Sequence, residues 1–497
     1  MTLHPATVRI LDEWLPRTQR AARVPSLSAA VARAGEVVWT GAVGVRDPAR
    51  RTAESSESVA PSQSVASGSS TGSVASGAST GSVESTGSAA TTDTRYRVGS
   101  ITKPLVAVAV LQLVAEGRLD LEAPIGDVLP DAPSRAASVA EHLDHTSGLA
   151  AEPTGAWWER SPGPSWAELV AAPPALLTAP GRRHHYSNTG YAVLGHLLEV
   201  LDGEPWDVVV RRRVLDPLGL AHTGPTADAS SATGVAVHPF ADVWHPEPVM
   251  DHQAMAPAGA MWSTPRDLVR FGSWTLGNVV ADRTVLPADL LAQMYEPRTL
   301  ADTPDTPWVS AHGLGLQITN QGGARRWGHG GSVPGFTAEL WCDPASGDVA
   351  AVCASATHPV GAAHGLLDLV AATQPAPTRP YVLDPDQADV AGLCGVWYWG
   401  PNPYTLTALP ALAPGRSVRL ALAPLTGGRR ETTFERAGSR GTWVGVVGDY
   451  WLGEELRPLS RGDAEPYALD IGTFLFTRVP YEPGTGTPGA HPEDAWR

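Results

Sequence analysis

The stretch that most constrains the fold of this chain runs from Val98 to Gly117. Residues 105–114 are apolar almost all the way round a helix and are interrupted only by Gln112. A helix of this kind is normally buried on every side, so residues 105–116 are predicted to form a central helix of a globular core. Gly117 supplies the residue type that most often ends a helix. The surrounding chain must therefore pack around this segment.

A serine and a lysine lie at the start of this helix, three residues apart. Residues at this spacing share a helix face, so the Lys103 ammonium group can approach the Ser100 hydroxyl. A serine hydroxyl is a weak nucleophile without a neighbour that takes its proton, which a buried lysine can do and an arginine cannot. Lys103 is the only lysine among 497 residues. We therefore predict that Ser100 is a nucleophile activated by Lys103; the alternative is that Ser100 only caps the helix.

Composition narrows the class of partner. The chain has 36 basic and 51 acidic residues and a formal net charge of −15, which disfavours nucleic acid and anionic membranes. Residues 1–23 are interrupted by charges and do not resemble a signal peptide, and no stretch is apolar enough to span a membrane. Three cysteines suit a reducing compartment. We expect a cytoplasmic protein with a small-molecule substrate and no cofactor; its oligomeric state stays open.

The chain divides by composition into a large and a small domain. Residues 1–373 form the large domain, in which residues 54–92 are dominated by Ser, Gly, Ala and Thr and are predicted to be a flexible low-complexity insert. The Pro-rich residues 374–384 are predicted to be a linker. Residues 385–482 contain six short strand-like runs typical of a small antiparallel barrel or sandwich, of which we predict the barrel. Residues 483–497 are predicted to be a disordered tail.

Two further motifs carry chemistry in other proteins. G-x-S-x-G occurs at residues 68–72 and 77–81, but inside the insert, where the strand and helix that the motif requires are missing. His142, Asp144 and His145 could suggest a metal site. The sequence offers no further well-placed ligand, so a structural turn after a short helix is the preferred interpretation. We predict no metal site.

Two later segments present more candidate site residues. Tyr186 and Asn188 lie on a loop before an apolar helical run, where functional side chains are often presented. Tyr186 could instead be a core aromatic, and Asn188 a cap or turn residue. Further on, a strand and turn contain glycines that let a ligand or another backbone approach closely. This segment reads His329-Gly330-Gly331-Ser332, and its histidine could also be purely structural.

Three blocks in a fixed order resemble the serine β-lactamase-like hydrolases. They are Ser100-Ile101-Thr102-Lys103, Tyr186-Ser187-Asn188 and His329-Gly330-Gly331. That family includes class C β-lactamases, D-alanyl-D-alanine carboxypeptidases, D-aminopeptidases and esterases. The resemblance spans residues 7–373 apart from the insert. It implies an α+β fold in which an antiparallel sheet is flanked by helices, with a helical subdomain and a site between the two.

The resemblance also implies a role for each matched residue. Ser100 would be acylated, Lys103 would take or relay its proton, and Tyr186 would be the general base in acylation and the acid for the leaving group. The backbone N–H groups of Ser100 and Ser332 would form an oxyanion hole. The positions implied for substrate binding and the oxyanion hole are Asn188, His329, Gly330, Gly331 and Ser332.

The third block departs from the family pattern. β-Lactamases and carboxypeptidases usually have K-T-G there, and its lysine helps to bind the substrate carboxylate. Here the position is His329, which is neutral or only partly charged near pH 7. We therefore predict a serine hydrolase that acts through an acyl-enzyme on a small ester or amide. The alternatives are β-lactamase or D-Ala-D-Ala carboxypeptidase activity, and a non-catalytic ligand-binding or sensor protein.

Overall fold

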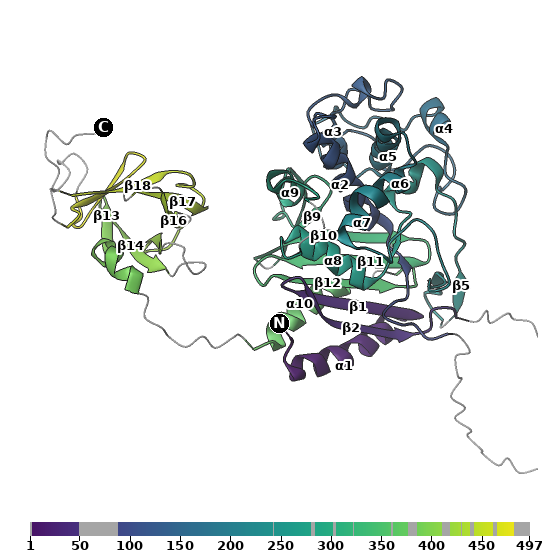
Figure 1. Cartoon of the computed structure of the whole chain (residues 1–497), viewed down its shortest axis with the longest axis horizontal. Coiled ribbons are helices and arrows are strands. Elements are labelled where there is room, and N and C mark those ends of the chain that lie inside the picture. Colours follow the sequence, from purple (N-terminus) through teal and green to yellow (C-terminus); the bar gives the residue numbers. More distant parts are fainter. Residues whose placement is uncertain are drawn as a thin grey trace, which may run out of the picture. The chain divides into compact units, whose positions relative to one another are not determined.

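A computed structural model describes most of the chain as two units, Met1–Ala376 and Pro377–Arg497 (Figure 1). The described residues are 2–48, 88–241, 243–279, 284–301, 305–321, 323–358, 361–375, 385–409, 418–428, 430–437, 442–460 and 465–481. Most of the predicted insert and linker and all of the predicted tail lie outside these residues. At the end of the predicted insert, Ala89 forms an isolated bridge with Val45. The predicted domain boundaries stay predictions.

The first unit is built on an antiparallel sheet. Its described strands follow the order β2-β1-β12-β11-β10-β9-β8-β7. Their bounds are β1 (Ser26–Arg33), β2 (Glu36–Gly44), β7 (Thr299–Leu300), β8 (Ser310–His312), β9 (Gln317–Gln321), β10 (Ala324–Val333), β11 (Phe336–Asp343) and β12 (Asp348–Ala354). Two short pairs lie outside this sheet, β3 (Tyr96–Arg97) with β6 (Trp262–Ser263), and β4 (Val235–Val237) with β5 (Trp244–Pro246).

Helices cover both faces of the sheet. The sheet has a hydrophobic core on each face, because successive side chains of a strand point to opposite faces. Leu27 and Val31 of β1 belong to the first core, and Ala30 belongs to the second. The first core packs against α1 (Pro5–Ala22) and α10 (Ala362–Thr373), and the second against α8 (Pro265–Thr275) (Figure 1). The remaining helices are α3 (Val139–Leu143), α4 (Trp166–Ala171), α5 (Asn188–Asp202), α6 (Trp206–Val210), α7 (Asp216–Leu218) and α9 (Ala288–Tyr295).

The predicted central helix is α2 (Thr102–Ala115), and its burial is confirmed. Every residue from Thr102 to Leu113 is buried, which fits a sequence that is apolar all round. A 3-10 turn, η1 (Gly99–Ile101), precedes the helix. Ser100 therefore lies in this turn rather than in the α-helix itself.

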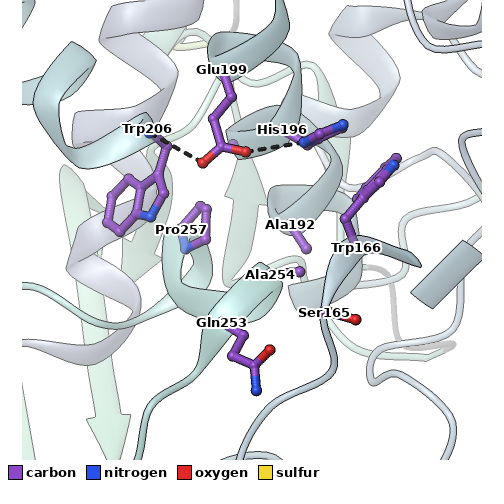
Figure 2. Close-up of a pocket in the computed structure, with 10 residues that line it drawn as sticks. Ser165, Trp166, Ala192, His196, Glu199, Trp206, Gln253, Ala254 and Pro257 are labelled. Atoms are coloured by element: carbon purple, nitrogen blue, oxygen red, sulfur yellow. Dashed lines mark hydrogen bonds and ion pairs between the residues drawn. The ribbon is translucent and has the colours of Figure 1, made fainter. Parts of the chain in front are cut away.

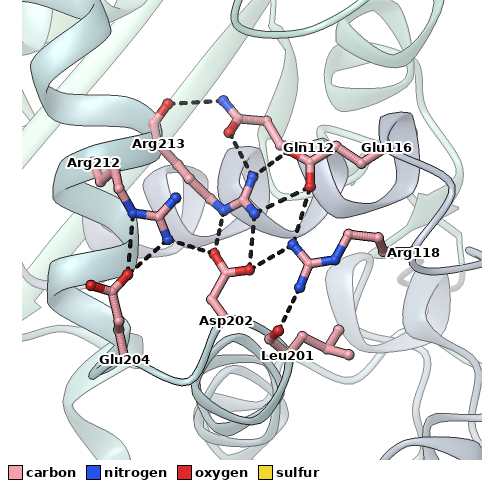
Figure 3. A network of polar contacts seen from close by, with 8 residues as sticks. All are labelled: Gln112, Glu116, Arg118, Leu201, Asp202, Glu204, Arg212 and Arg213. Atoms are coloured by element: carbon pink, nitrogen blue, oxygen red, sulfur yellow. Dashed lines mark hydrogen bonds and ion pairs between the residues drawn. The ribbon is translucent and has the colours of Figure 1, made fainter.

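An ion-pair network explains the single polar break in the apolar run (Figure 3). The Gln112 side chain donates to the backbone oxygen of Arg213 at 2.9 Å. Arg213 in turn pairs with Asp202 at 2.6 Å and with Glu116 at 2.7 Å. The hydrogen bonds from Arg213 hold the pKa of Asp202 far below its usual range. The network ties the C-terminal ends of α2 and α5 to the π-helical turn Arg211–Leu215.

The second unit contains a closed antiparallel barrel. Its strands are β13 (Gly395–Trp399), β14 (Asn402–Leu409), β15 (Arg419–Pro424), β16 (Thr432–Ala437), β17 (Thr442–Gly448), β18 (Glu455–Leu459), β19 (Ala468–Ile471) and β20 (Phe474–Thr477). The predicted α+β fold with a C-terminal barrel is confirmed. Sequence reasoning missed β18 and β19, because β18 contains Pro458, which cannot donate to a ladder, and β19 is short. Among the described residues, no helix is long and apolar enough to cross a membrane.

Candidate active site

The side chains of Ser100, Lys103 and Asn188 meet at the start of α2. The Lys103 Nζ atom lies 2.9 Å from Ser100 Oγ, 2.7 Å from Asn188 Oδ1 and 2.7 Å from the carbonyl oxygen of Ala258. Ala258 ends a 3-10 turn, η4 (Gln253–Ala258), that packs against α5. Three segments that are distant in the sequence thus converge on the one lysine of the chain.

Burial changes the protonation of Lys103. The residue is fully buried, and loss of hydration lowers the Lys103 pKa to about 7, although the charges of Glu152 and Glu159 act in the opposite direction. The Glu152 carboxylate accepts a hydrogen bond from Asn188 Nδ2 at 2.7 Å, so it lies one side chain away from the lysine. Near neutral pH, Lys103 is therefore present both as an ammonium ion and as a free amine.

The backbone of β10 runs directly beside the serine. A Cβ atom added to Gly331 would lie 1.9 Å from the carbonyl oxygen of Val98, and one added to Gly99 would lie 2.7 Å from the amide nitrogen of Ser332. Gly99 also has a φ of +51°, which favours glycine. A Cβ atom added to Gly330, in contrast, would meet nothing within 4 Å. Glycine is thus required at two of these positions for close backbone approach.

The register of β10 orients the backbone of Ser332. Val333 and Phe336 flank a two-residue turn between β10 and β11, and Ser332 belongs to the next pair of the ladder. Bonded and non-bonded pairs alternate in an antiparallel ladder, so the Ser332 N–H points away from β11. The edge of β10 that faces away from β11 is paired with β9, but this pairing ends at Gly328 and does not reach Ser332. The Ser332 N–H is therefore directed toward the segment that contains Ser100.

Tyr186 presents a buried hydroxyl to this site. The hydroxyl has no hydrogen-bond partner among the described residues, and Lys103 Nζ lies 5.0 Å from the centroid of the ring. Burial raises the Tyr186 pKa, while the neighbouring Ser100 side chain acts in the opposite direction. The phenol therefore stays protonated near neutral pH. The prediction that Asn188 lies on a loop is wrong, because Asn188 is the first residue of α5.

Four histidines, the histidine cluster (His145, His184, His312 and His329), lie beside Tyr186, and all but His184 have a ring contact with it. His145 stacks on the Tyr186 ring with centroids 4.2 Å apart, and His184 Nε2 lies 3.0 Å from His312 Nδ1. Burial lowers the pKa of all four, that of His329 to about 3, so the cluster is neutral near pH 7. Sequence reasoning missed His312, which lies on β8 outside any motif.

The segment around His142 is structural. The His142 ring nitrogens lie 2.6 Å from Ser134 Oγ and 2.8 Å from the carbonyl oxygen of Ser138. The Asp144 carboxylate accepts hydrogen bonds from the backbone and hydroxyl of Thr146. Within the described part of the chain, no group of three or more His, Cys, Asp or Glu side chains could hold a metal ion.

A separate cavity of about 230 Å³ lies further along α5, beside Ala192, His196 and Glu199. Figure 2 shows Glu199 between His196 and the backbone of Trp206, with hydrogen bonds of 3.0 and 3.3 Å. The cavity is also lined by Trp166 and Pro257, but not by Ser100, Lys103 or Tyr186. It is therefore distinct from the candidate active site.

Comparison with known proteins places this arrangement in a family. A family model described as Beta-lactamase matches residues 11–374. The chain belongs to the Beta-lactamase family. A second model, described as a domain of unknown function (DUF7586), matches residues 386–478 and so covers the barrel.

Individual members of the Beta-lactamase family show the range of the similarity. Penicillin-binding protein 4 of Amycolatopsis lactamdurans is 33% identical over 289 residues, which are 53% of this chain and 73% of that protein. Esterase EstB of Burkholderia gladioli is 35% identical over 179 residues, 32% of this chain and 44% of that protein. A D-stereospecific amidohydrolase from Streptomyces sp. has a TM-score of 0.51 at 25% identity, over 71% of this chain and 97% of that one. The esterase and the amidohydrolase are hydrolases by name, and the amidohydrolase has a similar fold.

Proposed function

We propose that this protein is a serine hydrolase that forms an acyl-enzyme on Ser100 with a small ester or amide substrate. The observation that supports this most strongly is the set of contacts around Lys103 Nζ. A neutral amine has two N–H groups and one lone pair. The oxygens of Asn188 and Ala258 can accept both N–H groups, which leaves the lone pair for the hydroxyl proton of Ser100. The same three oxygens can also accept from the three N–H groups of an ammonium ion, so the contacts suit both protonation states that a lysine passes through when it takes up a proton.

In the proposed acylation, Ser100 Oγ bonds to the substrate carbonyl carbon while its proton passes to Lys103 Nζ. The carbonyl oxygen becomes an oxyanion, for which the backbone N–H groups of Ser100 and Ser332 are the proposed donors. Tyr186 gives its proton to the leaving oxygen or nitrogen as the carbonyl re-forms, and Lys103 returns a proton to the phenol. Water then attacks the acyl carbon, one of its protons passes through Lys103 Nζ to Ser100 Oγ as the ester bond breaks, and the acid is released.

This scheme gives the role of base to Lys103 instead of Tyr186. A general base works best when its pKa lies near the working pH. Burial lowers the Lys103 pKa to about 7 and raises that of Tyr186 far above this range. A protonated phenol is suited to donate to the leaving group. The buried hydroxyl of Tyr186 has no partner at hydrogen-bond geometry among the described residues, and the Ser100 side chain is close enough to act on the Tyr186 pKa.

The proposed substrate needs no carboxylate. His329 stands at the third motif, and its pKa of about 3 leaves it without a charge that could bind an anion. The esterase and the amidohydrolase among the relatives support an ester or amide. The similarity to a penicillin-binding protein keeps β-lactams as a second candidate. The cytoplasmic location and the absence of nucleic-acid partners stay predictions, and the oligomeric state stays open.

The nucleophile can be tested by intact-mass spectrometry after incubation with a fluorophosphonate. We expect one adduct on the wild type, none on Ser100→Ala, and strongly slowed labelling of Lys103→Ala. Ser346→Ala, which changes an exposed serine in the turn after β11, should label like the wild type. A folded wild-type protein without an adduct would contradict the proposal and favour the non-catalytic alternative.

The substrate class can be tested with three chromogenic compounds. We expect steady hydrolysis of a p-nitrophenyl ester or a p-nitroanilide, and its loss in Ser100→Ala. Nitrocefin hydrolysis should be much slower, because His329 offers no cation to the carboxylate of a β-lactam. Faster turnover of nitrocefin than of the ester would favour β-lactamase activity instead.

A further inference from the structure

Arg97 is a buried arginine that forms no ion pair with a carboxylate in the part of the chain that the structure describes. It lies on β3 and is only 2% exposed. One of its terminal nitrogens lies 3.0 and 3.2 Å from the ring nitrogens of His252, and its Nε has no hydrogen-bond partner among the described residues. A buried charge that is left unpaired costs folding free energy. Other buried or half-buried arginines pair with aspartates in this chain, namely Arg33, Arg213 and Arg326.

The surroundings of Arg97 do not neutralise its charge. Burial lowers the pKa of His252 to about 3, so the imidazole is uncharged. The charge of Glu159 acts on Arg97 electrostatically, but the Glu159 carboxylate accepts its hydrogen bond from Trp157 Nε1 at 3.0 Å instead. Among the described residues, the fold therefore keeps the guanidinium charge of Arg97 inside without a carboxylate in hydrogen-bond contact.

A cavity of about 310 Å³ lies beside this guanidinium group. Arg97 and His252 line it together with Trp206 and Trp262, and Asp207 and Asp251 are also part of the lining. Trp206 borders both this cavity and the cavity of Figure 2. The Asp251 carboxylate accepts from the backbone N–H of Gln253 at 3.0 Å, and Asp207 is half-buried in the first turn of α6.

We infer that this cavity is a binding site for a small monocarboxylate, which pairs with Arg97. The planar fork of a guanidinium group matches a carboxylate through two parallel hydrogen bonds. The two tryptophans provide apolar walls for a short alkyl or aryl group, as in ligand pockets generally. Asp207 and Asp251 repel additional negative charge, so a dianion such as phosphate or a dicarboxylate is disfavoured.

The cavity neighbours the proposed catalytic lysine but is separate from it. Residues on either side of Ala258 line the cavity, while the Ala258 carbonyl oxygen accepts from Lys103. The His252 ring packs edge-on against Trp158 at 4.7 Å, and Trp158 Nε1 donates to Glu152. Binding to the cavity can be measured without any turnover, so its test is independent of the proposed function.

Isothermal titration of the full-length protein with sodium acetate tests the site. Ionic strength is held constant with sodium chloride, and acetamide serves as the uncharged analogue. We expect saturable binding of acetate with a dissociation constant of about 10 mM or lower, and none of acetamide. Arg97→Met should abolish acetate binding. Arg95→Met, which removes a nearby arginine that is paired with Asp228, should keep it.

A second variant decides the question if Arg97→Met does not fold. Asp207→Asn removes a negative charge from the cavity lining and should lower the acetate dissociation constant about threefold or more. Asp289→Asn changes an acidic residue in the first turn of α9 and should have no effect. Any of three results would overturn the inference. The heats of acetate titration could fail to saturate in the wild type, or a folded Arg97→Met could bind acetate as tightly as the wild type. Asp207→Asn could also bind acetate no more tightly than the wild type.

Discussion

Replacing Glu152 with glutamine should shift the pH dependence of Ser100 acylation to lower pH. The Glu152 carboxylate is joined to Lys103 through the side-chain amide of Asn188, with a hydrogen bond of 2.7 Å on each side. Its negative charge raises the Lys103 pKa and partly opposes the effect of burial. Glutamine keeps the size of the side chain and its acceptor oxygen but removes the charge. The Lys103 pKa should therefore fall further.

The size of the shift follows from this geometry. Two hydrogen bonds and the width of an amide separate the charges by roughly 7 Å, so they interact by about 2.4 kcal/mol at an effective dielectric constant of about 20 and by about 0.6 kcal/mol in water. Glu152 is exposed, which places the interaction toward the lower value. We expect the Lys103 pKa to fall by about 0.5 to 1 unit from its value of about 7.

The assay is the rate constant of fluorophosphonate labelling as a function of pH. Lys103 accepts a proton only as the free amine, so the rate should rise with pH through the Lys103 pKa and then reach a plateau. The midpoint should lie near 7 in the wild type and at about 6 to 6.5 in Glu152→Gln. Glu36→Gln removes the same charge from the hairpin between β1 and β2 and should keep the wild-type midpoint.

Two results would refute this reasoning. A midpoint in Glu152→Gln equal to or above that of the wild type would show that the carboxylate does not act on Lys103. A wild-type rate that is flat across the pH range would show that Lys103 is not the group that takes the serine proton.

Three further predictions concern stability. Gly331→Ala should lower the melting temperature, because the added Cβ would lie 1.9 Å from the carbonyl oxygen of Val98. Gly330→Ala should leave the melting temperature unchanged, because a Cβ there meets nothing within 4 Å. Equal melting temperatures of the two variants would contradict the packing described. The Lys103 pKa is about 7 in the folded state and 10.5 in the reference state, so the folded protein binds fewer protons between these values. From pH 7 to 9, urea unfolding should therefore show the wild type gaining about 2 kcal/mol relative to Lys103→Met, and a constant difference would contradict the lowered pKa. Arg213→Met should cost about 3 kcal/mol of unfolding free energy, because it removes two hydrogen bonds from the buried Asp202 carboxylate. The exposed Arg17→Met should cost about 0.5 kcal/mol or less, and similar losses in the two variants would contradict the role of the network.

Much of the fold was predictable because local patterns encode it. The apolar run that became α2 needs no knowledge of the remaining chain, since a helix that is apolar all round must be buried. The three-residue spacing of Ser100 and Lys103 brings their side chains together for the same local reason. Short apolar runs separated by Gly and Pro indicated the barrel. They could not reveal β18, whose proline conceals its strand character.

The remaining site residues depend on contacts between distant segments. Lys103 meets Asn188 and the carbonyl oxygen of Ala258 across 85 and 155 residues of sequence, and no local periodicity encodes such pairs. The same limit applies to His312 in the histidine cluster and to Glu152. Nor could the sequence show that the carbonyl oxygen of Ala258 faces a lysine.

The sequence by itself determined which groups are available: one serine, one lysine three residues later and a tyrosine before a helix. Only the tertiary structure decided their protonation. Burial lowers the pKa of Lys103 and raises that of Tyr186, which supports our proposal that Lys103, and not the Tyr186 implied by the family resemblance, takes the serine proton. The physical reason is that a pKa depends on hydration and neighbouring charges, and both are set by packing between segments that lie far apart in the chain.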